Sequence, residues 1–254
     1  MLNTIIKQLE KRFNISFPAM NVWFHGSPFK VYEYKQLHKD MNLNKTDKLL
    51  DFGCGKGRQT ILLSKYVIST VGVDISSKQI AIAKKYFKIF EKKRNINFIK
   101  ADILKDNHDL LRNNYFDKVV SVCVLEHVKN VQKVVDKLFR LLKKGGEIHL
   151  SLDSLSNGFS NELIEKHKKN CYVEQYFTIP SISNILKNSG FKIIEIKSIL
   201  KSDYAVNEFQ KRILSGSRYN LFRKFFAYNK FKRDDEKLKN IDEGIFIIAR
   251  AIKP

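Results

Sequence analysis

An apolar stretch, Leu49–Phe52, contains one acid, Asp51. Three glycines at alternate positions follow it: Gly53, Gly55 and Gly57. Glycine tolerates a positive φ and lets the backbone pass close to a ligand, because it has no Cβ. A carboxylate beside such a turn can accept a hydrogen bond from a cationic amine. A helical stretch comes next. The order of strand, glycine turn and helix predicts a nucleotide-like ligand at the carboxyl edge of a parallel sheet.

The spacing of the glycines separates this turn from two other nucleotide-binding loops. Dinucleotide-binding folds carry G-x-G-x-x-G, but the sixth position here is Arg58. A P-loop needs Ser or Thr after Gly-Lys, whereas Gly57 follows Lys56. The seven residues from Asp51 to Gly57 resemble instead the D-x-G-C-G-x-G signature of the class I S-adenosylmethionine (SAM) dependent methyltransferases. The resemblance implies a Rossmann-like fold, SAM as methyl donor and S-adenosylhomocysteine as product.

The resemblance also implies which residues contact the methionine part of SAM. Asp51 would accept a hydrogen bond from the ammonium group, directly or through water. The main chain of Gly53, Cys54, Gly55 and Gly57 would follow the methionine moiety. The helix that begins beyond the turn has a partly positive N-terminus, which favours the carboxylate of the ligand.

Two further acids end the next two apolar strands, and the resemblance implies that both bind the nucleoside part of SAM. Asp74 would bind the ribose hydroxyls and Ile75 would lie against the adenine. Asp102 would accept from the adenine amino group, and the backbone N–H of Ile103 would donate to the ring. Each acid alone is equally well explained as a helix cap, but three acids that end successive strands favour the ligand. Cys123, at the end of the fourth strand, completes the expected cofactor contacts.

Catalytic candidates follow that fourth strand, in Val124-Leu125-Glu126-His127-Val128. This segment resembles the Leu-Glu-His-Val sequence of small-molecule methyltransferases, including the ubiquinone-pathway O-methyltransferases. His127 is a candidate general base, because an imidazole exchanges protons near neutral pH. The alternative is that Glu126 and His127 cap the next helix and shape the pocket. Such relatives can bind a divalent metal through a further glutamate. Because Cys123 stands at that position, we expect no metal site.

The first 44 residues are predicted to form an N-terminal helix and an aromatic strap. Apolar residues with helical spacing are Leu2, Ile5, Ile6, Leu9 and Phe13. Residues 18–34 contain the aromatic side chains Trp23, Phe24, His25, Phe29, Tyr32 and Tyr34. They are interpreted either as a strap packed over the sheet or as a cover of the SAM pocket that contacts the acceptor. On the second interpretation Tyr34 is a third catalytic candidate.

Strands and helices alternate between residues 45 and 153. Strands are expected at 49–52, 69–74, 96–102, 117–124 and 146–152, and again at 191–199 and 244–252. Helices are expected at 59–66, after Ser76 or Ser77, from Val128 to Leu142 with Gly145 as its stop, at 161–169 and at 181–188. The connection 106–115 is expected to be partly helical. This order predicts an α/β fold: a Rossmann-like, seven-stranded, mostly parallel sheet with an antiparallel last strand, helices on both faces and a small helical cap. The methyltransferase domain would span 45–254, with insertions at 154–180 and 200–243.

The composition limits location and partners. The net charge of the 254 residues is +21, which attracts anions. Three scattered cysteines fit a reducing cytoplasm, and no apolar run is long enough for a membrane span. Residues 211–233 contain eight basic and six aromatic side chains and no acid. We interpret them as a cap facing an anionic acceptor, as a helix lying on an acidic membrane, or as an RNA-binding surface.

These observations predict a SAM-dependent methyltransferase of class EC 2.1.1. Its acceptor would be an oxygen or nitrogen of a small molecule, such as a sugar, a quinone precursor or a lipid-linked intermediate. An RNA methyltransferase is the first alternative, although no Asn/Asp-Pro-Pro-Tyr-type sequence follows the fourth strand. The second is a SAM-fold binding protein without catalysis. The acceptor and the oligomeric state stay open.

Overall fold

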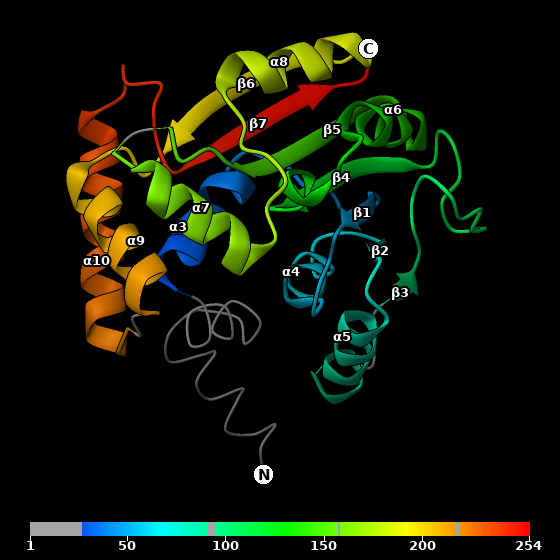
Figure 1. Ribbon diagram of the computed structural model, residues 1–254. Coiled ribbons are helices and arrows are strands. Elements are labelled where there is room, and N and C mark those ends of the chain that lie inside the picture. The colour runs from blue at the N-terminus through cyan, green and yellow to red at the C-terminus, as the bar shows by residue number, and fades with distance from the viewer. Residues whose placement is uncertain (1–26, 91–94, 157, 217–218) are drawn as a thin grey trace.

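A seven-stranded sheet organises the protein in the computed structural model, which describes residues 27–90, 95–156, 158–216 and 219–254. The strand order is β3-β2-β1-β4-β5-β7-β6 (Figure 1). The strands are β1 Lys48–Phe52, β2 Ser69–Asp74, β3 Ile96–Lys100, β4 Phe116–Val122, β5 Leu142–Asp153, β6 Lys192–Ile199 and β7 Phe246–Ile252. Strands β1 to β5 pair in parallel, and β7 runs antiparallel to both β5 and β6. The predicted Rossmann-like sheet with an antiparallel last strand is confirmed.

Helices cover both faces of this sheet. They are α3 Pro28–His38, α4 Arg58–Leu63, α5 Ser77–Phe90, the 3₁₀ helix η1 Leu125–His127, α6 Val131–Leu141, α7 Asn161–Cys171, α8 Ile179–Asn188, α9 Asp203–Ser215 and α10 Leu221–Lys237. Helices α6 and α8 lie on one face, and α3, α4 and α5 lie on the other (Figure 1). Helices α7, α9 and α10 gather beyond the carboxyl ends of the central strands (Figure 1).

Alternation along the strands explains this two-sided arrangement. Successive side chains of a strand point to opposite faces. On β1, Leu50 joins the apolar core under α6 and α8, while Leu49 joins the core under α3. On β7, Ile247 and Ile248 divide in the same way. Both faces are therefore apolar, which explains why the strands were recognisable as nearly continuous apolar runs.

The cap is held to the sheet by aromatic side chains. Phe29 of α3 is 1% exposed. Its ring centre lies 4.9 Å from that of Phe231 in α10 and 5.1 Å from that of Phe209 in α9. The insertion 200–243 thus holds two helices that pack on α3. On α10 the aromatic side chains Phe222, Phe225 and Phe226 are exposed, in contrast to Phe231.

Two local predictions are wrong. Residues 106–115 form turns and irregular structure without a helix. Gly145, with φ +77°, lies within β5 and donates its N–H to the carbonyl of Lys253 over 2.8 Å. Helix α6 already ends at Leu141, because Leu142 takes an extended conformation. The glycine therefore lies at an irregularity in the pairing of β4 with β5 and does not end the helix.

The N-terminal segment is described only in part. The predicted helix over the first residues and the aromatics Trp23, Phe24 and His25 lie outside the described residues. Phe29, Tyr32 and Tyr34 belong to α3, which begins where the Ser27 hydroxyl accepts a hydrogen bond from the Lys30 amide over 3.3 Å. The division at residue 44 stays a prediction. In the part of the chain that the structure describes, every helix lacks the length or the apolar character that a bilayer span requires.

Candidate functional site

The glycine turn after β1 is built so that one position faces open space. The N–H groups of Gly53 and Cys54 both donate to the Val73 carbonyl, over 2.8 and 2.9 Å, which ties the turn to β2. A Cβ on Gly53 would lie 2.2 Å from a methyl carbon of Val124. Gly55 has φ +50°, and nothing lies within 4 Å of the place of its Cβ. The turn is therefore packed on one side and open beside Gly55, where a ligand has room.

The other positions of the turn are occupied by protein. A Cβ on Gly57 would lie 2.6 Å from the Phe98 ring, so this glycine allows α4 to pack closely. The Cys54 side chain is buried in an apolar cluster with Ile61 and Ile80. Only the main chain of Cys54 is thus available to a ligand, as the family resemblance implies.

Asp74, at the end of β2, connects the turn to the next helix. One carboxylate oxygen accepts from the Gly55 amide over 2.9 Å, and the other accepts from the Ser76 amide over 2.8 Å. The neighbouring Ile75 is 67% exposed. A carboxylate has about four lone-pair sites, so Asp74 keeps acceptor capacity for two hydroxyl groups. The exposed Ile75 side chain offers an apolar surface to a flat ring.

Asp51 lies deeper, behind the first turn of α4, and is 1% exposed. Its oxygens accept from the Thr60 hydroxyl over 2.6 Å and from the Gln59 side-chain amide over 3.1 Å. The Gln59 carbonyl oxygen is in turn 3.2 Å from Nε2 of His38 in α3. Burial raises the pKa of Asp51 to about 6, although both hydrogen bonds oppose the shift. A cationic ligand group would favour the ionised form of this carboxyl.

Asp102 forms a turn directly after β3. One oxygen accepts from the Leu104 amide over 3.0 Å, and the other lies 3.6 Å from Nζ of Lys105. The side chain of Ile103 is buried in the apolar core. The turn places Asp102 and Ile103 at the same sheet edge as Asp74, because β2 and β3 are parallel neighbours.

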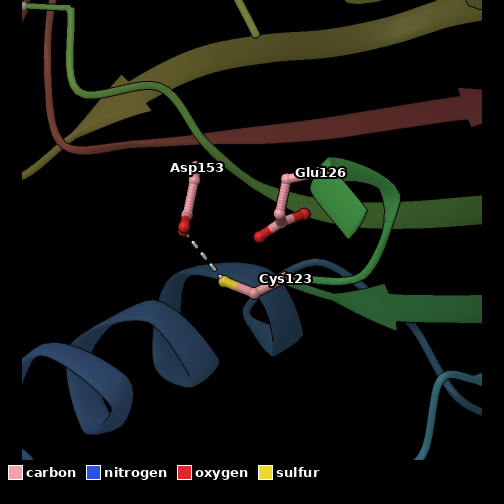
Figure 2. A group of neighbouring side chains, drawn as sticks. All are labelled: Cys123, Glu126 and Asp153. Atoms are coloured by element: carbon pink, nitrogen blue, oxygen red, sulfur yellow. Dashed lines mark hydrogen bonds between the residues drawn. The ribbon is translucent and has the colours of Figure 1, made fainter. Parts of the chain in front are cut away.

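A second group of polar side chains lies at the carboxyl ends of β4 and β5. We define the thiol–carboxylate cluster as Cys123, Glu126 and Asp153. Figure 2 shows the carboxylates of Glu126 and Asp153 directed toward the sulfur of Cys123. The Cys123 thiol is 3.4 Å from an oxygen of Asp153. It also donates to the carboxylate of Glu33, on α3, over 3.0 Å.

The cluster is buried and carries an excess of acids. Glu33 and Glu126 have no exposed surface, and Asp153 is 7% exposed. Burial raises the pKa of Glu126 and that of Asp153. Repulsion from Asp153 and Glu33 adds to the shift of Glu126, and repulsion from Glu33 adds to that of Asp153. Lys30 supplies the nearby cation: its Nζ is 2.8 Å from the Cys123 sulfur and 2.8 Å from Glu33.

Glu126 and His127 face different environments, although they are adjacent in the chain. Glu126 is fully buried, and its carbonyl accepts from the amides of Glu174 and Gln175. His127 is exposed, and its Nδ1 donates to the Tyr172 carbonyl over 3.0 Å. That bond leaves Nε2 of a neutral His127 as the acceptor. The two residues therefore do not form one paired unit.

Tyr34 lies between the two groups. Burial raises the pKa of Tyr34 to about 12, and the charges that act on it include Lys30, Glu33, Asp51 and Cys123. Its ring stacks on His38, with centroids 5.8 Å apart. Both rings line a cavity of about 440 Å³ between α3 and α4. None of the predicted SAM-binding residues lines this cavity, so we do not assign it to the cofactor.

The sequence did not indicate Lys30, Glu33 or Asp153 as site residues. Asp153 ends its strand as Asp51 and Asp74 end or nearly end theirs, so the same rule would have found it. Lys30 and Glu33 lie more than 80 positions from Cys123 and reach it only through the packing of α3 on the sheet. No pattern in α3 marks them.

The central part of the chain matches a known family model. The model described as a methyltransferase domain matches residues 50–150, which include the glycine turn, Asp74, Asp102 and Glu126. The chain carries a class I SAM-dependent methyltransferase domain. The prediction of this family, of its fold and of SAM as its cofactor is confirmed.

Named relatives share this methyltransferase domain. A human arsenite methyltransferase is 34% identical over 111 residues, which are 41% of this chain and 30% of that protein. The Saccharomyces cerevisiae sterol 24-C-methyltransferase is 24% identical, over 63% of this chain and 43% of that protein. A ubiquinone biosynthesis O-methyltransferase from Pelagibacter ubique is 29% identical, over 47% of this chain and 50% of that protein. The matches to these relatives span half of their length or less.

Solved structures agree with the fold. A putative methyltransferase from Bacillus halodurans superposes with a TM-score of 0.63 at 17% identity, over 86% of this chain and 97% of that one. A phosphoethanolamine N-methyltransferase from Haemonchus contortus, in complex with SAM, gives a TM-score of 0.61 at 17% identity, over 94% of this chain and 60% of that one. At this identity the likeness concerns the fold.

Proposed function

We propose that the protein transfers the methyl group of SAM to an oxygen or nitrogen of a small organic acceptor. The observation that carries this proposal is the open side of the turn at Gly55, with the Asp74 carboxylate bound to its amide. SAM would be held by Asp51, the main chain from Gly53 to Gly57, Asp74 with Ile75, and Asp102 with Ile103. The turn offers the close main-chain approach that the methionine part needs, and the acid offers acceptors for the ribose.

The acceptor would lie between the turn and the ends of β4 and β5. Several elements enclose that space. Helix α3 contributes Tyr34, and the segment after α7 closes over η1 through the bonds of Glu174 and Gln175 to the Glu126 carbonyl. The amide of Phe177 donates to the Asp153 carbonyl over 3.0 Å. An acceptor atom positioned there would attack the sulfonium methyl in line, and S-adenosylhomocysteine would leave.

His127 and Tyr34 are the candidates for handling the acceptor proton. The Nδ1 bond of His127 to the Tyr172 carbonyl orients the ring and leaves Nε2 free to accept a proton. Tyr34 has a raised pKa, so its neutral hydroxyl can donate a hydrogen bond to the acceptor. We propose that Glu126 shapes the site, because it is buried away from the surface on which His127 lies.

The names of the relatives support a small-molecule acceptor. Arsenite, a sterol and a ubiquinone precursor are small, and a phosphoethanolamine methyltransferase shares the fold. The charge of +21 is compatible with an anionic acceptor, and also with RNA. RNA methylation is therefore an outcome that the test must distinguish.

Purified protein is incubated with labelled SAM and either a metabolite extract or total RNA. We expect label in a small molecule that chromatography separates from protein, and none in RNA after digestion. His127→Gln should lower turnover more than tenfold without changing binding of S-adenosylhomocysteine. Label that appears only in RNA would contradict the small-molecule proposal. Unchanged turnover of His127→Gln would end its assignment as the base.

A further inference from the structure

The thiol–carboxylate cluster brings together three possible metal ligands from separate parts of the chain. Cys123 follows β4, Glu126 belongs to η1 and Asp153 ends β5. One ligand atom of each lies within 4.8 Å of the other two (Figure 2). The pairing of β4 with β5 explains this proximity, because Val122 is in register with Ser151. The residues that follow these positions therefore emerge side by side at the same edge.

Glu126 provides the second observation, independent of the acidic cluster itself. Its side chain has no exposed surface, and neither carboxylate oxygen has a hydrogen-bond partner among the described residues. The group is directed into the cluster (Figure 2). A buried carboxylate without a partner is costly, and buried acids are normally paired or coordinate metals. The orphaned oxygens indicate that a cation belongs beside them.

Lys30 shows that the cluster accepts a positive charge. Its ammonium contacts the Cys123 sulfur and Glu33, each at 2.8 Å. It makes no hydrogen bond with Glu126, whose oxygens stay unpartnered. The Lys30 side chain is 33% exposed, so it has a path to solvent. Glu33 would keep the hydroxyl of Ser151 as a donor after Lys30 had left.

We propose that Cys123, Glu126 and Asp153 bind a Zn²⁺ ion, which enters as the Lys30 ammonium leaves the sulfur. A thiolate with two carboxylates suits zinc, since sulfur disfavours Mg²⁺ and Ca²⁺. Zinc bonds of about 2.3 Å to sulfur and about 2.1 Å to oxygen place neighbouring ligands about 3.5 Å apart. Small side-chain rotations bring the three ligand atoms to that spacing.

One other occupant and one other set of ligands fit less well. An organic amine is larger than a metal ion. Glu33 and Glu126 have no exposed surface, so an amine of that size has no open route to their carboxylates. The adjacent pair Glu126–His127 does not form the site, because His127 is exposed and bonded to Tyr172. The cluster thus shares the positions of Cys123 and Glu126 with the metal-binding relatives, but Asp153 takes the place of His127, and the sequence did not indicate Asp153.

The test uses Co²⁺ as a spectroscopic probe on the full chain after treatment with a chelator. We expect one equivalent of Co²⁺ to produce a thiolate-to-cobalt charge-transfer band, and Zn²⁺ to abolish it by competition. Cys123→Ser should lose the band, while Cys171→Ser should keep it, because Cys171 is an exposed cysteine on α7. Asp153→Asn should weaken Zn²⁺ binding at least tenfold. Circular dichroism checks that each variant is folded.

Lys30→Met distinguishes a metal site from a merely structural cluster. Removing the competing ammonium should tighten Zn²⁺ binding at least tenfold, whereas a structural role predicts no gain. The proposal is overturned if no charge-transfer band forms, if the band survives Cys123→Ser, or if Lys30→Met leaves the Zn²⁺ affinity unchanged. Binding of methylammonium without binding of Zn²⁺ would assign the cluster to an amine instead. None of these readouts requires methyl transfer.

Discussion

The amide of Gly55 donates a hydrogen bond to the carboxylate of Asp74 over 2.9 Å. This bond joins the glycine turn after β1 to the end of β2, so the group proposed to hold the ribose also orders the main chain proposed to hold the methionine. The two halves of the proposed SAM site are therefore coupled through one side chain.

Asp74→Ala should lose both functions at once. It removes the proposed ribose acceptor and releases the Gly55 amide, so we expect binding of S-adenosylhomocysteine to weaken at least a hundredfold in a calorimetric titration. Asp74→Asn keeps one acceptor oxygen and should lose less, about tenfold. The control is Asp109→Asn, a carboxyl at the exposed connection after β3. Equal affinities of the two Asp74 variants and the wild type would contradict the coupling.

Gly53→Ala and Gly55→Ala form a matched pair with different expected effects. Alanine at 53 meets Val124 at 2.2 Å and has an unfavourable positive φ, so the free energy of unfolding should fall by about 2 kcal/mol or more. Alanine at 55 meets nothing and should cost only about 1–2 kcal/mol for its backbone conformation, yet it should block the ligand. Thermal unfolding with and without S-adenosylhomocysteine separates these losses.

Val124→Ala tests whether Gly53→Ala and Gly55→Ala act through the different causes assigned to them. Combined with Gly53→Ala, it removes the methyl groups that clash and should recover part of the lost stability. Combined with Gly55→Ala, it should recover neither stability nor ligand binding. A Gly55→Ala variant that binds S-adenosylhomocysteine like the wild type would refute the assignment of the open side of the turn.

If Asp51 pairs with the ammonium group of the ligand as proposed, ligand binding should depend on pH. Its pKa of about 6 in the folded protein means that the carboxyl is largely protonated below pH 6, where it cannot pair with the ammonium of the ligand. Affinity for S-adenosylhomocysteine should therefore rise about fivefold from pH 5 to 6 and level off above pH 7. Calorimetry across this range measures the profile, and a flat profile would exclude Asp51 from the site.

The raised pKa of Asp51 affects stability in the opposite direction: a higher pH favours ligand binding but lowers the stability of the ligand-free protein. Between the ordinary value of 3.8 and about 6, the folded protein binds more protons at Asp51 than the unfolded chain. This group thus lowers the free energy of unfolding as pH rises through that window. Asp51→Asn should then stabilise the ligand-free protein at pH 8 by about 1 kcal/mol or more, while it weakens binding. Urea unfolding tests the first effect.

Local patterns predicted the sheet and indicated residues for the cofactor half of the candidate site, because both depend on neighbouring residues. The glycines and Asp51 occur within seven positions, and Asp74 ends a strand whose apolar run is continuous. The second half depends on contacts between distant residues. Cys123 meets Glu33 across 90 positions, and only the docking of α3 on the sheet creates that contact. Gly145 misled the prediction because a glycine after an apolar helix face fits a helix stop, whereas here it serves a strand.

The helical cap should depend on Phe29 for its attachment. Phe29 is 1% exposed and contacts rings of both α9 and α10, so Phe29→Ala should cost about 3–5 kcal/mol of unfolding free energy. Phe222→Ala is the matched control: its ring is 80% exposed, and the change should stay within about 0.5 kcal/mol. Similar costs for the two variants in urea unfolding would show that α3 is not the support of the cap.

Calorimetric titration of the full chain with S-adenosylhomocysteine at pH 7.5 tests the central claim most directly. We expect one saturable site per chain whose affinity Asp74→Ala lowers at least a hundredfold, and ligand at a hundred times its dissociation constant should raise the free energy of unfolding by about 2.7 kcal/mol. An absence of binding heat together with an unchanged unfolding temperature at millimolar ligand would contradict the assignment of the turn at Gly55 as a SAM site.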